Sequence, residues 1–218
     1  ATVESHTSGV GVTAITERTC DIGAVARKLK LVEKGRGADL NEVLVATDAL
    51  AVYVDQANPV SKLSLVDVRR VFSGEVADWS QVGGAPGPIE VVIPQTKTAC
   101  STNFKALAMG EANFVATSKI TQIASETLPL VTGNPHAISF VSFGALADHP
   151  GLKALAIDGK APSEAGYGIN QEFYLVIHGA PQGAVGKFID FFLSGPGRDL
   201  IARNGMTPAR GGVAKAGM

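Results

Sequence analysis

The sequence predicts an α/β fold in which mostly parallel sheets are flanked by helices, and three observations support this class. Short apolar runs alternate with helix-like patterns along the whole chain, which is the element order of parallel sheets. Residues 43–54 are apolar almost throughout, as expected for strands buried on both faces. Breaks at 55–59 and 166–171 indicate two chain crossings between two lobes.

The two breaks set the expected lobes. We expect residues 1–56 and 171–218 to form a discontinuous lobe I and residues 57–170 to form lobe II, joined by two hinge crossings. Asn58 precedes Pro59, an order that disfavours helix and favours a connection. The 218 residues are sufficient for one large domain or two small ones.

For lobe I, the periodicity of apolar residues and the positions of turn residues predict alternating strands and helices. The expected elements are the strands Thr2–Ser5, Asp21–Val25 and Phe173–Ile177 and the helices Gly9–Arg18, Ala184–Leu193 and Pro196–Arg203.

Two strands, Val43–Ala46 and Ala49–Val54, are expected on either side of the polar pair Thr47 and Asp48, leading toward lobe II. Within lobe II we expect the helix Leu65–Phe72, capped by Ser64. The remaining expected elements are the strands Ile89–Ile93, Ala137–Val141 and Leu155–Ile157 and the helices Ser101–Met109 and Lys119–Leu130.

Composition excludes several classes of protein. With 45% hydrophobic and 18% charged residues the chain is typical of a soluble globular protein, and its formal net charge of −1 gives no general attraction to nucleic acid. No apolar run reaches the roughly 20 residues of a membrane helix, and no signal peptide precedes Ala1, so we expect a cytosolic protein or a mature exported one. Cys20 and Cys100 are expected to be free thiols. The four histidines lack metal-ligand spacing, so no metal or cofactor is expected.

Two clusters of hydroxyl residues and glycine each lie between a strand-like run and a helix-like pattern. The first comprises His6, Thr7, Ser8 and Gly9, and the second spans 96–102. A helix start carries unpaired N–H groups and a partial positive charge, and nearby hydroxyls can also donate to an anion. Together, the two clusters predict a binding site for a small oxyanion. The alternative is that each cluster is an ordinary helix N-cap.

Several motifs resemble those of the phosphate-binding proteins of bacterial ABC transporters. The most specific is the run 72–84, Phe-Ser-Gly-Glu-Val-Ala-Asp-Trp-Ser-Gln-Val-Gly-Gly. It is accompanied in the same order by the segments 21–24, 48–52, 137–141, 188–191 and 205–208. The resemblance implies a two-lobed type II periplasmic-binding-protein fold, exported from the cytoplasm, that closes over an anion in the interlobe cleft and delivers it to a membrane permease.

The resemblance also implies which residues contact the ligand. They are Ser8 and Gly9 in lobe I and the matching loop of Thr98, Ala99, Cys100, Ser101 and Thr102 in lobe II. The two clusters add Thr7 and Lys97, and Ala26, Arg27, Gln95 and Asn170 are further candidates. Three features differ from the family: its opening strand and helix have no counterpart here, its second-lobe arginine is absent, and Ala26 stands where a polar Ser or Asp is expected. Phosphate is the family's usual ligand, and sulfate, a larger oxyanion, an organic anion or no ligand remain open.

Other functions remain as alternatives. A sensor, adaptor or assembly relative with a degenerate site would also fit the loss of the arginine. An enzyme is not expected, because the Cys100 thiol, although at a helix start, has no histidine nearby in the sequence to act as a base. An exposed sheet edge would either be covered by Gly211–Met218 or pair with a second copy as a homodimer.

Overall fold

The computed structural model describes residues 2, 8–34 and 39–209 and confirms the α/β class. The chain divides into two compact units, unit 1 with residues 1–48 and 171–218 and unit 2 with residues 49–170. It enters unit 2 within one long strand, β2 (Leu40–Asp55), and returns at the start of β9 (Asn170–His178). The first boundary lies at 48/49, whereas the sequence analysis expected 56/57. The predicted lobe ranges stay a prediction. The expected strand Thr2–Ser5 and the segment Gly211–Met218 lie outside the described residues.

Unit 1 contains a sheet in the order β1, β9, β2. The strand β1 is antiparallel to β9, and the short β10 is antiparallel to β2. The other elements follow the prediction closely, except that the short helix α2 and the short strand β10 were not predicted. Their bounds are α1 (Ser8–Thr16), β1 (Gly23–Val25), α2 (Leu31–Lys34), α6 (Gly183–Leu193), α7 (Gly195–Arg203) and β10 (Thr207–Pro208).

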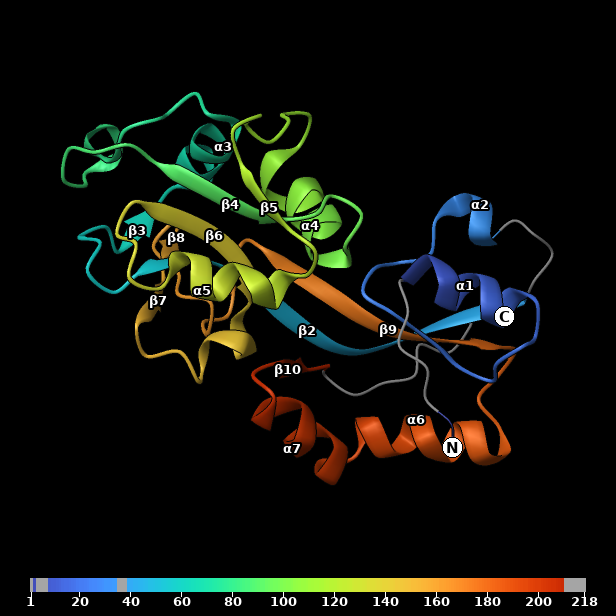
Figure 1. Cartoon of the computed structure of the whole chain (residues 1–218). Helices are drawn as coiled ribbons and strands as arrows, with labels where there is room; N and C mark the ends of the chain where they lie inside the picture. The colour runs from blue at the N-terminus through green and yellow to red at the C-terminus, as the bar shows by residue number, and fades with distance from the viewer. Residues whose placement is uncertain (1, 3–7, 35–38, 210–218) are drawn as a thin grey trace. The chain divides into compact units, whose positions relative to one another are not determined.

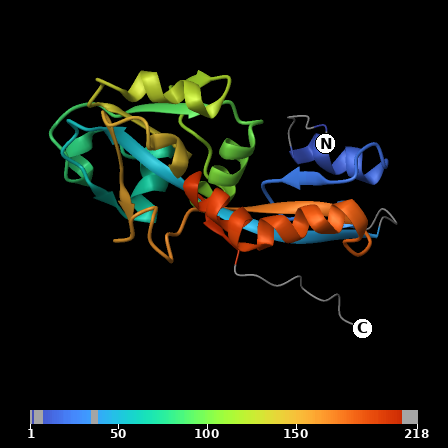
Figure 2. The same ribbon diagram turned by 90° about the horizontal axis from the view of Figure 1, so that it is seen from below.

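The sheet of unit 1 is covered on both faces. Figure 1 shows α1 and α6 on opposite sides of it, and Figure 2 shows α6 running along β2 and β9. Val12 of α1 packs with Val176, whereas Ile189 of α6 belongs to a separate cluster on the other face. Gly23 permits close approach of α1, because a Cβ at this position would lie 2.9 Å from the carbonyl oxygen of Gly11.

Unit 2 contains a mixed sheet, where mostly parallel sheets were expected. The strand β4 is parallel to β5 and β6, but β2 is antiparallel to β6 and β7. A second, two-stranded parallel sheet joins β3 and β8. The bounds are β3 (Lys62–Leu63), α3 (Leu65–Ser73), η1 (Trp79–Val82), β4 (Glu90–Pro94), α4 (Ala99–Phe104), the π-helix η2 (Lys105–Met109), β5 (Lys119–Thr121), η3 (Ala124–Glu126), α5 (Thr127–Val131), β6 (Ala137–Ser142), η4 (Phe143–Leu146), β7 (Leu152–Ala154) and β8 (Ala156–Ile157).

An aromatic cluster anchors α4 to the sheet of unit 2. Phe104, at the end of α4, stacks on Phe140 of β6 with ring centroids 3.8 Å apart, and Phe72 of α3 meets Phe104 edge-on at 5.0 Å. All three side chains are fully buried. Figure 1 shows α3 and α4 on one side of the sheet and α5 on the other. The cluster therefore fixes the helix that follows the second hydroxyl cluster.

The most specific sequence motif has a structural role. Trp79 is buried, and its Nε1 donates to the carbonyl oxygen of His136 at 3.1 Å. Asp78 caps the following turn by accepting from the N–H of Ser80. Hydrogen bonds from Ser80 and from the backbone hold the pKa of the Asp78 carboxyl below its usual value. The motif therefore stabilises a turn of unit 2.

Predictions for two segments of the chain were wrong. The helix expected at Lys119–Leu130 is instead the strand β5 followed by short helical turns, because β-branched Ile120 and Thr121 favour a strand and Pro129 fits a helix only in its first turn. The two strands expected on either side of Thr47 and Asp48 form the single strand β2. Buried Asp48 accepts a hydrogen bond from Gln171 Nε2 at 2.9 Å, so a polar side chain is accommodated within the strand.

Candidate functional site

The first hydroxyl cluster begins α1 of unit 1. Ser8 is half-buried, and its Oγ accepts a hydrogen bond from the backbone N–H of Ala26 at 3.1 Å. Gly9 follows in the first turn of the helix and is exposed. Within the described residues the Ser8 hydroxyl hydrogen has no acceptor. The structure thus brings together Ser8 and Ala26, which are 18 positions apart. Thr7 and His6 lie outside the described residues.

Arg27 is engaged within its own turn. Its guanidinium donates to both carboxylate oxygens of Glu33, at 2.9 and 2.8 Å. These hydrogen bonds lower the pKa of the Glu33 carboxyl and raise the pKa of Arg27. The sequence analysis offered Arg27 as a further candidate for anion contact. In this structure the guanidinium of Arg27 forms a bidentate ion pair with Glu33.

The second hydroxyl cluster connects β4 to α4 in unit 2. Thr98 is the N-cap of α4: its Oγ1 accepts from the N–H of Ser101 at 3.2 Å and donates to the carbonyl oxygen of Gln95 at 3.0 Å. Ser101 is only 1% exposed, and its hydroxyl donates to the carbonyl oxygen of Pro94 at 2.7 Å. The hydroxyl of Thr102 reaches a carbonyl of the same loop at 3.4 Å. All three hydroxyl hydrogens are therefore used inside the loop.

The donors that remain in this loop are mainly backbone groups. Within the described residues the backbone N–H groups of Lys97 and Ala99 have no acceptor, and the exposed Lys97 ammonium has no ion-pair partner. The side-chain amide of Gln95 donates to the backbone and the side-chain oxygen of Gln122, each at 3.0 Å. Cys100 is half-buried, and no disulfide joins it to Cys20 in this structure. Backbone N–H groups without an acceptor at a helix start can bind an anion.

The last candidate, Asn170, lies at the start of β9. Its side-chain amide donates to the carbonyl oxygen of Tyr167, while the Tyr167 hydroxyl donates to that of Leu50 at 3.1 Å. Tyr167 is only 2% exposed, so both residues stabilise the turn before β9.

The described residues contain no group of three or more His, Cys, Asp or Glu side chains that could hold a metal ion. None of the helices in this part of the chain is long and apolar enough to cross a bilayer.

A comparison with protein families identifies the fold family. The model of the PBP superfamily domain matches residues 1–196. The chain belongs to the PBP superfamily. Among curated members, the phosphate-binding protein PstS of Borreliella burgdorferi is 22% identical over 219 residues, covering 94% of this chain and 78% of that protein. PstS 2 of Streptococcus pneumoniae is 36% identical over 80 residues, 37% of this chain and 26% of that protein.

Solved structures of the PBP superfamily agree with this fold. A Clostridium perfringens protein solved with bound phosphate is 28% identical, with a TM-score of 0.80 over 92% of this chain and 84% of that one. An ABC-type phosphate transport receptor from Vibrio cholerae is 25% identical, with a TM-score of 0.78 and the same coverage.

Sequence reasoning named Lys97 and Ala99 in this loop and the N–H groups of its helix start, and its assignment of the loop to ligand binding stays a prediction. Thr98 is a typical N-cap residue, which places Ala99 at the first helical position, where an N–H has no intrahelical partner. The N-cap residue Thr98 is therefore the sequence signal that marks the N–H of Ala99 as one without an intrahelical partner. No sequence pattern indicated that the Arg27 guanidinium would pair with Glu33, six residues further along the chain.

Proposed function

We propose that this chain is the solute-binding protein of an ABC transporter and that it captures a phosphate-type oxyanion. Its family and its relatives in phosphate transport support this function. The observation that carries the proposal is the presence, at two helix starts, of donors that have no acceptor in the described residues. We assign Ser8 and Gly9 from unit 1, and Lys97 and Ala99 from unit 2, as the groups that bind the anion.

The remaining hydroxyl residues of the second cluster have a different role in this proposal. Thr98 and Ser101 are positioning residues, because their side chains hold the loop against β4. Thr102 and Cys100 complete the first turns of α4. Of the groups proposed to contact the anion, only Lys97 carries a full charge. An ammonium acts as a point charge and lacks the planar fork of arginine.

Ligand selectivity follows from the kind of groups assigned. None of them carries a carboxylate, so the proton of hydrogen phosphate meets no charged acceptor. Sulfate has the same tetrahedral shape as phosphate, and because it carries no proton it needs only hydrogen-bond donors. We therefore expect phosphate, arsenate and sulfate to bind with affinities within about tenfold of one another, a difference of about 1.4 kcal/mol.

Calorimetric titration of the full chain with phosphate, arsenate and sulfate tests the proposal. We expect saturable binding of phosphate and a raised unfolding temperature in its presence. Replacing Ser8 with Ala and Lys97 with Gln should each weaken binding, whereas Thr117→Ala, at an exposed position of unit 2, should not. Absence of heat and of any thermal shift with all three anions would contradict the proposal.

A non-transporting sensor, adaptor or assembly subunit is the second candidate. The pairing of Arg27 with Glu33, and the use of three cluster hydroxyls within their own loop, favour it. A crystal grown with phosphate decides between the two functions. Ordered anion density at Ser8 supports capture, and a protein group in that position supports the degenerate relative.

The remaining assignments belong to the same proposal. We propose an exported, periplasmic or extracellular protein that binds its solute without turnover and delivers it to a membrane permease. Fractionation of the native cells tests the location, and co-purification with the permease tests the partner. Homodimerisation stays a prediction, to be tested by analytical ultracentrifugation.

A further inference from the structure

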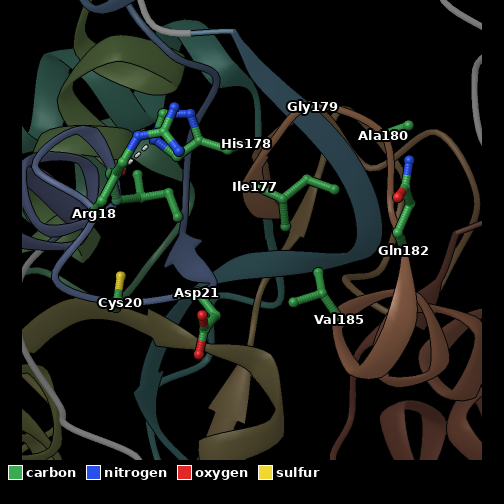
Figure 3. Close-up of a pocket in the computed structure, with 10 residues that line it drawn as sticks. Arg18, Cys20, Asp21, Ile177, His178, Gly179, Ala180, Gln182 and Val185 are labelled. Atoms are coloured by element: carbon green, nitrogen blue, oxygen red, sulfur yellow. Dashed lines mark hydrogen bonds between the residues drawn. The ribbon is translucent and has the colours of Figure 1, made fainter.

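Unit 1 contains a pocket at the end of α1 opposite to Ser8 (Figure 3). Its volume of about 410 Å³ lies within the range of about 300–1,000 Å³ that is typical of small-molecule sites. It is bounded by the end of α1, the loop before β1, the end of β9 and the start of α6. None of the residues assigned to oxyanion capture lines it.

Two opposite charges line this pocket. Arg18 follows α1 in a left-handed conformation, with φ 58°, and Asp21 lies in the loop before β1. Both side chains are exposed, and neither forms an ion pair with a described residue. Figure 3 shows Arg18 and Asp21 on different sides of the pocket. The pocket therefore offers one cationic and one anionic contact to the same small molecule.

His178 lines the pocket and is held to the end of α1. Its Nε2 lies 2.7 Å from the carbonyl oxygen of Ile15. Because a carbonyl can only accept, Nε2 carries a hydrogen, and in the neutral ring Nδ1 is then an acceptor. Nδ1 is buried and has no hydrogen-bond partner in the described part of the chain. Because protein atoms cover it, Nδ1 is not accessible to a molecule in the pocket.

Apolar side chains form the rest of the wall. Ile15, Ile177 and Val185 line the pocket, and the last two lie between Asp21 and Gln182 in Figure 3. The combination of an anion contact, a cation contact and an apolar surface matches the groups of an α-amino acid.

We propose that this pocket binds a small α-amino acid in its zwitterionic form. The carboxylate contacts Arg18, the ammonium contacts Asp21, and a small apolar side chain packs on Ile177 and Val185. The site is separate from oxyanion capture, and it does not depend on that function.

NMR titration of the full chain with L-alanine tests the site, with acetate and ethylamine as ligands that carry only one of the two charged groups. We expect saturable shifts of the backbone signals of Arg18, Asp21 and Gly179 with L-alanine. Each half-ligand should bind at least about tenfold more weakly, because it loses one charge-assisted contact. Phosphate is titrated separately, so loss of one binding activity can be distinguished from loss of the other.

Variants localise the binding. Arg18→Asn removes the guanidinium while keeping a residue that tolerates the left-handed conformation, and Asp21→Asn removes the carboxylate. Each should weaken L-alanine binding about tenfold or more and leave phosphate binding unchanged. Arg203→Asn, at an exposed arginine of α7, is the matched control and should bind normally. The proposal is overturned if L-alanine causes no saturable shifts, if acetate binds equally well, or if the control weakens binding as much as Arg18→Asn.

Discussion

Replacing Ser101 with Ala separates two interpretations of the second hydroxyl cluster. The sequence and its family resemblance place this hydroxyl against the anion. In the structure the side chain is 1% exposed and donates to the carbonyl oxygen of Pro94 at 2.7 Å. We therefore expect Ser101→Ala to reduce the stability of unit 2 much more than it reduces affinity for phosphate.

The expected magnitudes follow from this single contact. An intramolecular hydrogen bond contributes about 0.5–1.5 kcal/mol net, and a buried polar group that loses its partner costs about 1–3 kcal/mol. The free energy of unfolding should fall by about 1–3 kcal/mol. A direct hydrogen bond to a charged ligand is worth about 1.5–3 kcal/mol, which corresponds to a 10- to 150-fold loss of affinity. Without that contact, the loss should stay below about tenfold.

Urea denaturation and calorimetric titration measure the two quantities on the same protein. Ser125→Ala is the control, because Ser125 is an exposed serine in the same unit. A loss of affinity above about 100-fold, with an unchanged urea midpoint, would refute the structural interpretation and place the Ser101 hydroxyl on the ligand.

Further predictions concern the charge of the site, the core and pH. Lys97→Gln should weaken phosphate binding and flatten its dependence on salt, measured by titration at several ionic strengths, because it removes the only full charge among the proposed contacts. Phe104→Ala should lower the free energy of unfolding by about 3–5 kcal/mol, the usual cost of truncating a fully buried Phe, and its stacking on Phe140 places the loss toward the upper end of that range; an unchanged urea midpoint would contradict this packing. Glu33→Gln should destabilise the chain by up to about 1 kcal/mol at neutral pH. Because the folded pKa of Glu33 is lowered, this difference should be present above the ordinary glutamate pKa of about 4.3 and disappear as pH falls through the folded value, which denaturation across that range measures.

The helices that could be predicted are those whose local signals agree. The helix α3 has Ser64 at its N-cap, an apolar face that includes Val68 and Val71, and Gly74 at its end, in the left-handed conformation with φ 81°. Each signal acts within a few residues, so the sequence alone contains it. The failure at Lys119–Leu130 has the opposite cause, since β5 forms only by pairing with β4, a partner far away in sequence.

Predicting the site was limited by what residue types reveal. A serine or threonine hydroxyl can donate or accept in almost any direction, so a cluster of them does not indicate which hydrogens point outward. In the structure, Thr98 and Ser101 turn inward to the backbone, whereas the oxygen of Ser8 accepts from Ala26 and its hydrogen has no acceptor among the described residues. The sequence could locate both clusters, but only the fold distinguishes positioning hydroxyls from those that can bind.

The proposed contacts imply how the anion's charge is balanced. The ion pair with Glu33 engages Arg27, which leaves Lys97 as the only cation among the candidate residues without such a partner in the described chain. The other donors are neutral hydroxyl and N–H dipoles, which compensate the loss of water around an ion without adding a counter-charge. A dianion bound by such groups keeps most of its net charge. Affinity should therefore depend more on the neutral donors that reach the anion than on the surface charge of the chain.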